Sequence, residues 1–146
     1  EEIDIIRQVS DMVDYIRKRS PGTVSFVTNT HGKSEILARV SAPLFDWVME
    51  NLLKNALDAM EGKGYIKVDL RDEKNSVIID VTDTGKGISR QNIAKVFKPG
   101  FTTKKRGWGL GLSLSKRIIS QYHKGEIFVK HSEPGKGTTF RIVLRK

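Results

Sequence analysis

The sequence contains no cysteine. A chain without thiols forms no disulfides and offers no thiolate ligands, which excludes a disulfide-stapled scaffold and a cysteine zinc site. Long hydrophobic runs are also missing, since no stretch approaches the roughly 20 apolar residues that a membrane-spanning helix needs. No N-terminal run has the pattern of a signal peptide. We therefore expect a cytoplasmic domain that makes no direct membrane contact, and a membrane anchor elsewhere in the parent protein stays open.

Histidine is scarce, and the spacing of His31, His123 and His131 does not match a metal site. The 146 residues, with 38% hydrophobic and 29% charged side chains, are typical of one globular domain spanning 1–146. The chain begins with Glu1 rather than methionine and opens inside a helical pattern. We expect a fragment of a longer protein.

Acidic residues are outnumbered, and the formal net charge of +9 raises the question of nucleic acid binding. The basic residues are scattered, however, and no basic helix or aromatic strand platform stands out. The one dense basic stretch, residues 95–106, lies beside glycines. A small phosphate-bearing ligand explains that placement at least as well as a polynucleotide, so we expect no nucleic acid partner. DNA binding is kept as a remote alternative.

Hydrophobic periodicity predicts helices over residues 2–19, 44–60, 89–96 and 110–122. Runs rich in β-branched residues predict strands over 24–28, 36–40, 65–70, 77–81, 127–130 and 138–144. Helices interspersed with hairpins indicate the α+β class, in which helices cover one face of a mixed sheet.

The predicted helix over 44–60 carries two asparagines four residues apart, Asn51 and Asn55, with Asp58 about one turn further on. This spacing places both amides on one helical face. Asparagine is a poor residue inside a helix, so the pair suggests a polar ligand, and amide oxygens suit Mg²⁺. Taken alone, the pattern is still better explained by two solvent-facing asparagines.

A second segment, residues 83–88, follows the predicted strand 77–81 and reads Asp-Thr-Gly-Lys-Gly-Ile. The carboxylate of Asp83 can accept a hydrogen bond from an exocyclic amino group such as that of adenine. Gly85 and Gly87 would let a flat ring approach the backbone. An ordinary Asp-x-Gly turn is the alternative, and for this segment alone it is the better one.

A third segment, residues 97–106, combines exposed aromatics, a Pro-Gly pair and three consecutive cations. It is a poor core segment and fits a mobile lid in which Lys104, Lys105 or Arg106 meets a terminal phosphate. The alternative is a solvated run of charge.

A fourth segment, residues 107–113, places three alternating glycines directly before the last predicted helix. Glycines at a helix start expose backbone N–H groups and the positive end of the helix dipole, which together favour an anion. A helix start that merely packs against a neighbour would not need three such glycines, so here the residues themselves favour a ligand site.

The order and spacing of these segments resemble the ATPase superfamily of DNA gyrase, Hsp90, the mismatch-repair protein MutL and histidine kinases. Residues 51–55 resemble the N box, 83–87 the first glycine box, 97–101 the F box and 107–111 the second glycine box of the histidine kinase branch. Residues 135–138 resemble its final glycine-threonine element. The resemblance implies the catalytic and ATP-binding domain of a sensor histidine kinase. Its fold would be a two-layer α/β sandwich, with about five mostly antiparallel strands and about three helices.

The resemblance also implies roles. Asp83 would bind the adenine amino group with support from Thr138, while Asn55 and Asn51 would coordinate Mg²⁺, and Lys104 would neutralise the terminal phosphate. Asn51, Asn55 and Lys104 would thus be the catalytic residues. The full set expected to bind ATP is Asn51, Asn55, Asp58, Asp83, Gly85, Gly87, Ile88, Phe97, Thr102, Thr103, Lys104, Gly107, Gly109, Leu110, Gly111, Leu112 and Thr138.

Position 51 separates a kinase from a plain ATPase. Gyrase-like relatives carry a water-activating glutamate there, whereas this chain has Asn51, as histidine kinases do. Glu50 is one residue away and should point about 100° around the helix. Other positions depart from the pattern: Asp58 and Ala59 replace a basic residue and a tyrosine, and Gly100 replaces a phenylalanine. The run from Asn55 to Met60 is closer to the nitrogen-regulation-type kinases.

The implied partners are the histidine-bearing dimerisation helices of the parent protein and the receiver domain of a response regulator. We expect a monomeric fragment and a homodimeric parent. None of the three histidines fits the phosphoacceptor, so we expect this chain to bind Mg-ATP without phosphorylating itself. Two alternatives stay open, an anti-sigma-factor-type serine kinase and a degenerate regulatory module that does not use nucleotide.

Overall fold

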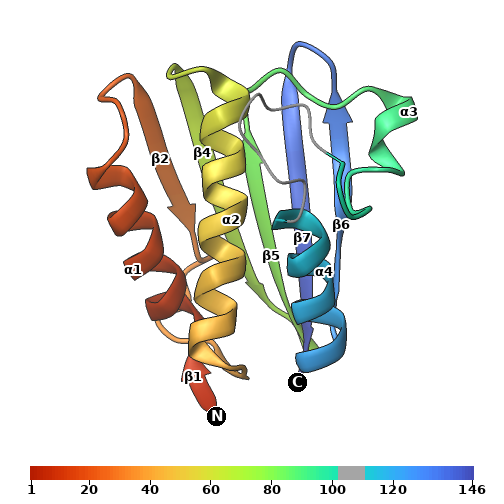
Figure 1. The fold of residues 1–146 in the computed structure, drawn as a ribbon. Helices are drawn as coiled ribbons and strands as arrows, with labels where there is room; N and C mark the ends of the chain where they lie inside the picture. The colour runs from red at the N-terminus through yellow and green to blue at the C-terminus, as the bar shows by residue number, and fades with distance from the viewer. Residues whose placement is uncertain (102–110) are drawn as a thin grey trace.

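The computed structural model describes residues 1–101 and 111–146. These residues form two layers, a twisted sheet and a row of helices that covers one of its faces (Figure 1). The strands are β1 (Glu2–Asp4), β2 (Val24–Asn29), β3 (Leu37–Arg39), β4 (Gly64–Asp72), β5 (Ser76–Asp83), β6 (Glu126–Glu133) and β7 (Gly137–Arg145). The helices are α1 (Ile5–Lys18), α2 (Ala42–Met60), α3 (Arg90–Ile93), α4 (Gly111–Arg117) and the π-helix η1 (Ile118–Tyr122).

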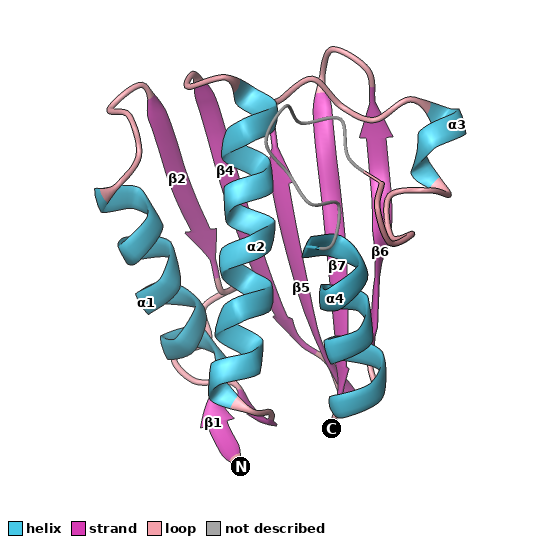
Figure 2. Cartoon of the chain, viewed as in Figure 1, coloured by secondary structure: helices cyan, strands magenta, loops and turns pink. Residues whose placement is uncertain are grey.

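The main sheet has five strands in the order β2-β4-β5-β7-β6. β2 runs parallel to β4, whereas the β4–β5, β5–β7 and β7–β6 pairs are antiparallel. The mixed five-stranded sheet beneath one layer of helices confirms the predicted α+β fold, as Figure 2 shows by secondary structure. None of the described helices is both long and apolar enough to cross a bilayer.

Strand periodicity produces the two faces of the sheet. In β5, Val77, Ile79 and Val81 point to one face and are buried, and so are their partners in β7, Leu144, Ile142 and Phe140. Successive side chains of a strand point to opposite faces, so one apolar row per strand meets the helices. α2 supplies the largest helical share of the core, with seven buried residues including Phe45 and Leu52.

The opposite face of the sheet is polar at its centre. Asp80 is only 7% exposed there, and its carboxylate receives two hydrogen bonds of 2.8 Å from the Arg141 guanidinium. The Lys130 ammonium lies 3.7 Å from the same carboxylate. This pairing satisfies a charge that would otherwise be costly to bury.

Four predicted elements need correction. Residues 2–4 were expected in the first helix but form β1, which pairs antiparallel with β3 in a separate two-stranded sheet. The predicted strand 36–40 is shorter, as β3 (Leu37–Arg39), and pairs with β1 outside the main sheet. The helix expected over 89–96 is the short α3, and the last helix changes to π-helical geometry at Ile118.

Candidate functional site

The end of β5, the start of β7 and the last turns of α2 meet at one end of the main sheet, at the top of Figure 1. β5 ends there at Asp83 and β7 begins there, and Asp83 and Thr138 are direct partners in the β5–β7 register. The last turns of α2, which carry Asn55 and Asp58, reach the same end. Two antiparallel strands and one helix thus bring together residues that are far apart in the sequence.

Asp83 is the buried carboxyl of this end, with 6% of its surface exposed. The Gly85 backbone N–H donates to its Oδ1 at 2.8 Å, and the Thr138 backbone N–H also donates to the carboxyl group. Burial raises the pKa of Asp83 above its usual value, although the two backbone hydrogen bonds lower it in part. A carboxylate with little water around it is a strong acceptor for a ligand donor that reaches it.

A hydroxyl chain extends from Asp83 toward β6. The Thr138 Oγ1 lies 2.8 Å from the Ser132 Oγ, and the Ile88 backbone N–H donates to the Ser132 Oγ at 2.7 Å. Thr138 is buried, and Ser132 connects it to the loop after β5. The sequence analysis missed Ser132, because nothing in strand β6 separates it from an ordinary edge-strand serine.

Two glycines at this end sit where a side chain has no room. A Cβ atom on Gly85 would lie 2.6 Å from the Ala59 carbonyl oxygen of α2. Gly87 has φ 76° and presses against the Glu133 carbonyl in the β6–β7 turn. The loop after β5 is therefore held tightly between α2 and that turn, and the Lys86 N–H donates to the Ala59 carbonyl at 2.9 Å.

Asn51 joins α2 to α4. Its Nδ2 donates to the Ser115 Oγ at 3.2 Å, and Ser115 donates to the Gly111 carbonyl at 2.9 Å. Because the single hydroxyl proton of Ser115 goes to Gly111, the hydroxyl accepts from Asn51, and this fixes which atom of the amide is nitrogen. The Asn51 Oδ1 then points at Gly111, where an added Cβ atom would collide with it. The lack of a side chain at Gly111 therefore leaves room for the Asn51 amide.

The remaining predicted residues lie around this end in different settings. Asn55 is half-buried on the same face of α2 as Asn51, and Asp58 is exposed. Phe97 stacks edge-on against Phe140 with ring centroids 6.0 Å apart, and like Ile88 and Leu112 it packs against the core. Thr102, Thr103, Lys104, Gly107, Gly109 and Leu110 lie outside the described residues.

The donor set at this end suits some ligands better than others. Among the described residues, no group of three histidine, cysteine or acidic side chains could hold a metal ion by itself. What the site offers is a buried carboxylate, hydroxyls, backbone N–H groups and half-buried amides. These groups suit an uncharged ring with an amino group, and a metal ion that arrives with its own oxygen ligands.

Comparison with protein families gives one match, to the family described as histidine kinase-, DNA gyrase B-, and HSP90-like ATPase, over residues 41–146. Among curated proteins, the chain is 43% identical to sporulation kinase E of Bacillus subtilis (strain 168) over 98 residues, which is 66% of this chain and 13% of that protein. It is also 43% identical to the sensor histidine kinase ZraS of Salmonella typhimurium over 114 residues, covering 76% of this chain and 24% of ZraS. The chain thus spans a quarter or less of these relatives.

Solved structures agree in fold. The catalytic domain of the histidine kinase ThkA matches with a TM-score of 0.86 at 27% identity, over 100% of this chain and 95% of that one. The mycobacterial sensor histidine kinase MprB matches with a TM-score of 0.86 at 23% identity, over 99% of this chain and 96% of that one. Because its identity is only 23%, the match to MprB supports the fold alone.

Proposed function

Because the chain belongs to the family of histidine kinase-, DNA gyrase B- and HSP90-like ATPases, we propose that it binds Mg-ATP at the Asp83 end of its sheet. We further propose that it donates the γ-phosphate to a histidine on dimerisation helices of the same parent protein. A response regulator receiver domain would then accept the phosphoryl group. The chain would serve as the catalytic domain of a two-component sensor histidine kinase.

The observation that carries the proposal is the setting of Asp83. Its carboxylate is 6% exposed and accepts hydrogen bonds from the backbone N–H groups of Gly85, at 2.8 Å, and Thr138. Burying a carboxylate costs stability unless hydrogen-bond donors replace the water that it loses. The amino group of adenine is a hydrogen-bond donor of the kind that this carboxylate accepts.

Asn55 is the residue that we assign to Mg²⁺. The amide oxygens at this end fit a hard cation, while the lack of a carboxylate cluster among the described residues fits an ion that keeps waters and phosphate oxygens as its other ligands. Asn51 donates to Ser115, so its share in metal binding would be through Oδ1. Bound Mg²⁺ would neutralise phosphate charge.

Asn51 also bears on whether the γ-phosphate is transferred to water. An amide cannot take a proton from water, and here its nitrogen is tied to Ser115 at 3.2 Å. Glu50, the neighbouring carboxylate, forms an ion pair with Lys54 at 3.2 Å. The chain would therefore hold ATP with little hydrolysis until a histidine acceptor is presented.

Replacement of Asn55 by alanine tests the metal assignment. We expect the affinity for ADP with Mg²⁺ to fall to that of wild type without Mg²⁺, a loss of about tenfold for one lost charge-assisted contact. Calorimetric titrations with and without Mg²⁺ measure it, and Mg²⁺ alone should give no heat with either protein. The matched control is Lys54→Ala, one residue earlier on α2 and exposed, which should retain the effect of Mg²⁺. An unchanged Mg²⁺ dependence in Asn55→Ala would refute the assignment.

The raised pKa of Asp83 predicts a pH dependence of binding. The proton enters at a higher pH than in an ordinary aspartate, because burial favours the neutral carboxyl. A protonated carboxyl is a poorer acceptor, so we expect the affinity to fall as the pH falls from 7 through the folded pKa. For the chain without ligand, the pH dependence of folding stability has the opposite direction. Protonation removes the cost of burying a charge, so the contribution of Asp83 to stability rises as the pH falls.

Adenosine is the probe for this pH series because it has no phosphates that titrate in the same range. Competition of adenosine against a fluorescent nucleotide would be measured from pH 7.5 downwards for as long as the chain stays folded. A dissociation constant that stays the same over that whole range would argue against a role for the Asp83 carboxylate in binding.

A further inference from the structure

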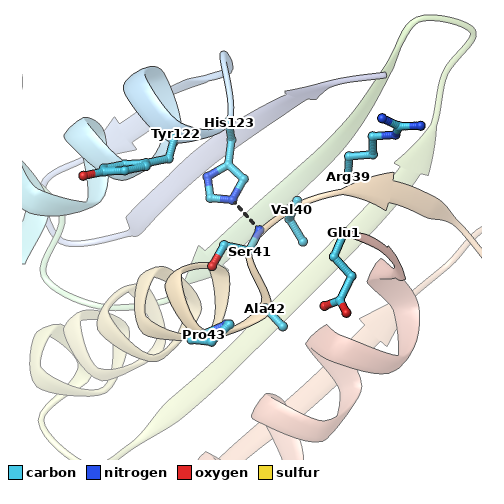
Figure 3. Close-up of a pocket in the computed structure, with 8 residues that line it drawn as sticks. All are labelled: Glu1, Arg39, Val40, Ser41, Ala42, Pro43, Tyr122 and His123. Atoms are coloured by element: carbon cyan, nitrogen blue, oxygen red, sulfur yellow. Dashed lines mark hydrogen bonds between the residues drawn. The ribbon is translucent and has the colours of Figure 1, made fainter.

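Hydrogen bonds connect α2 to the α4–η1 segment and its flank at two levels. At the start of α2, the Ser41 backbone N–H donates to Nε2 of His123 at 3.0 Å, beside a pocket of about 450 Å³ that lies far from Asp83 (Figure 3). Further along α2, the Asn51 side chain donates to the Ser115 hydroxyl at 3.2 Å. The second connection includes a residue of the proposed nucleotide site, whereas the first does not.

Ser115 is a polar residue inside the α4–η1 segment, and 0% of its surface is exposed. Its hydroxyl donates to the Gly111 carbonyl one turn earlier at 2.9 Å and accepts from Nδ2 of Asn51. A serine that bonds back to the carbonyl four residues earlier slightly destabilises a helix, and alanine has the higher helix propensity. The structure of α4 alone therefore does not call for a serine here. What the hydroxyl adds is the contact with Asn51.

The Asn51 amide has two ends that differ in chemistry and hardly in shape. Nδ2 faces Ser115, and Oδ1 faces the start of α4, where a Cβ atom added to Gly111 would collide with it. Rotation of the amide by half a turn would exchange the two atoms with little change in packing. An amide oxygen is a ligand for Mg²⁺, whereas an NH₂ group is a donor that offers a cation no ligand. The orientation of the amide thus decides whether Asn51 can bind a metal ion.

The Ser115 hydroxyl selects one of these two orientations. Its single proton goes to Gly111, so toward Asn51 it presents a lone pair, and the NH₂ end of the amide is the end that can bond to it. In the flipped orientation two acceptors, Oδ1 and the serine oxygen, would face each other. The loss of one ordinary hydrogen bond disfavours the flipped orientation by about fivefold.

We propose that Ser115 is a positioning residue for the nucleotide site: its buried hydroxyl holds the Asn51 amide so that Oδ1, and not the NH₂ group, is offered to the Mg²⁺ ion of Mg-ATP. This inference rests on the proposed function. Ser115 is fully buried and acts through Asn51. Its effect is therefore confined to the magnesium dependence of nucleotide binding, because the contact of the base with Asp83 does not depend on how the Asn51 amide is turned.

The ratio of ADP affinity with Mg²⁺ to ADP affinity without Mg²⁺ reports this role. We expect this magnesium ratio to fall from about tenfold in wild type to about threefold in Ser115→Ala, because the released amide presents its NH₂ group for part of the time. Affinity without Mg²⁺ should stay within about twofold of wild type. Calorimetric titrations of ADP measure both quantities.

Ser120→Ala is the matched control. The Ser120 hydroxyl also donates to the carbonyl four residues earlier, that of Lys116, at 2.7 Å, but Ser120 is exposed. Its replacement removes the same kind of backbone bond and leaves the contact between Ser115 and Asn51 in place. We expect the wild-type magnesium ratio in this variant. Thermal unfolding of both alanine variants checks that each is folded under the conditions of the titrations.

A second background separates the orientation of the amide from packing. In Asn51→Asp the carboxylate has two equivalent oxygens, so it offers an oxygen to Mg²⁺ however it is turned. Adding Ser115→Ala to Asn51→Asp should leave the magnesium ratio of that variant unchanged. If Ser115→Ala lowers the ratio equally in both backgrounds, the serine supports packing and not the orientation of the amide, and the proposal is wrong. A wild-type magnesium ratio in Ser115→Ala would also overturn it.

Hydrogen exchange of the Asn51 side-chain NH₂ group, followed by NMR, gives a readout in the free chain. These protons should exchange with water more slowly in wild type than in Ser115→Ala, because the serine oxygen accepts from this group. Equal exchange would show that Ser115 does not hold the amide, which contradicts the proposal. If wild type does not bind ADP, the proposed function fails and this role fails with it. If wild type binds ADP with a magnesium ratio that Ser115→Ala leaves unchanged, the positioning role fails alone.

Discussion

Asp83→Asn is expected to weaken ADP binding at least about 100-fold at pH 7.5, because the ligand loses a charge-assisted acceptor and meets an amide instead. The side chain is 6% exposed and already receives the N–H groups of Gly85 and Thr138. An asparagine can accept those bonds with its single oxygen, which leaves its NH₂ group toward the ligand. Two donors would then face each other where the carboxylate had accepted.

Folding should survive this substitution, since burial already raises the pKa of Asp83 and the neutral amide removes a buried charge. Thermal unfolding of the free protein is thus expected to change by only a few degrees. The loss of binding could then be attributed to the changed nucleotide site and not to unfolding.

The matched control is Asp80→Asn, the same substitution three residues earlier in β5 on the opposite face of the sheet. Asp80 is as buried as Asp83, but it is paired with Arg141 through two 2.8 Å hydrogen bonds. We expect this variant to lose stability, because Arg141 keeps its charge without a full partner, and to keep its ADP affinity. If Asp83→Asn binds ADP within threefold of wild type, the adenine assignment is wrong.

Gly87→Ala is expected to lower the free energy of unfolding by about 2–5 kcal/mol, the sum of left-handed backbone strain and overpacking. Gly87 has φ 76°, and its added Cβ atom would collide with the Glu133 carbonyl, a backbone group that cannot rotate away. The loop after β5 would have to move away from the β6–β7 turn. Nucleotide affinity should fall with it, because the Ile88 N–H and Ser132 would separate.

Gly135→Ala isolates the two contributions. Gly135 has φ 80°, nearly that of Gly87, but nothing lies within 4 Å of its added Cβ atom. This control therefore carries the backbone strain alone, about 1–2 kcal/mol. Urea unfolding of both variants gives the difference, which we attribute to the close approach of the two backbones. Equal losses of stability in the two variants would show that the close approach of Gly87 to Glu133 does not contribute to the destabilisation.

The architecture was predictable wherever local patterns decide it. β4 and β5 alternate apolar and polar residues around a charged turn, and α2 presents an apolar face between Ser41 and its final glycines, so these elements were expected nearly as they occur. The first residues were not, because their apolar spacing continues that of α1. What makes β1 a strand is pairing with β3 more than 30 residues away, which no local pattern encodes.

The site residues also fall into two groups, those that the sequence reveals and those that only the folded chain reveals. Asp83 and the glycines after it could be found from sequence, since their residue types are unusual at a strand end. Ser132 and the Asn51–Ser115 contact could not, because their meaning comes from partners that only the folded chain brings within 3.2 Å. Asn51 was expected to face a metal ion, and the structure adds a contact with α4. The ligand roles of all these residues stay predictions.

The most direct test of the account is a calorimetric titration of the wild-type chain with ADP, in the presence and absence of Mg²⁺, at pH 7.5. The account predicts binding of one nucleotide per chain, tighter with Mg²⁺ than without it. Absence of binding by protein that is folded by circular dichroism would contradict the account, because the buried Asp83 end of the sheet would then not be a nucleotide site in this chain.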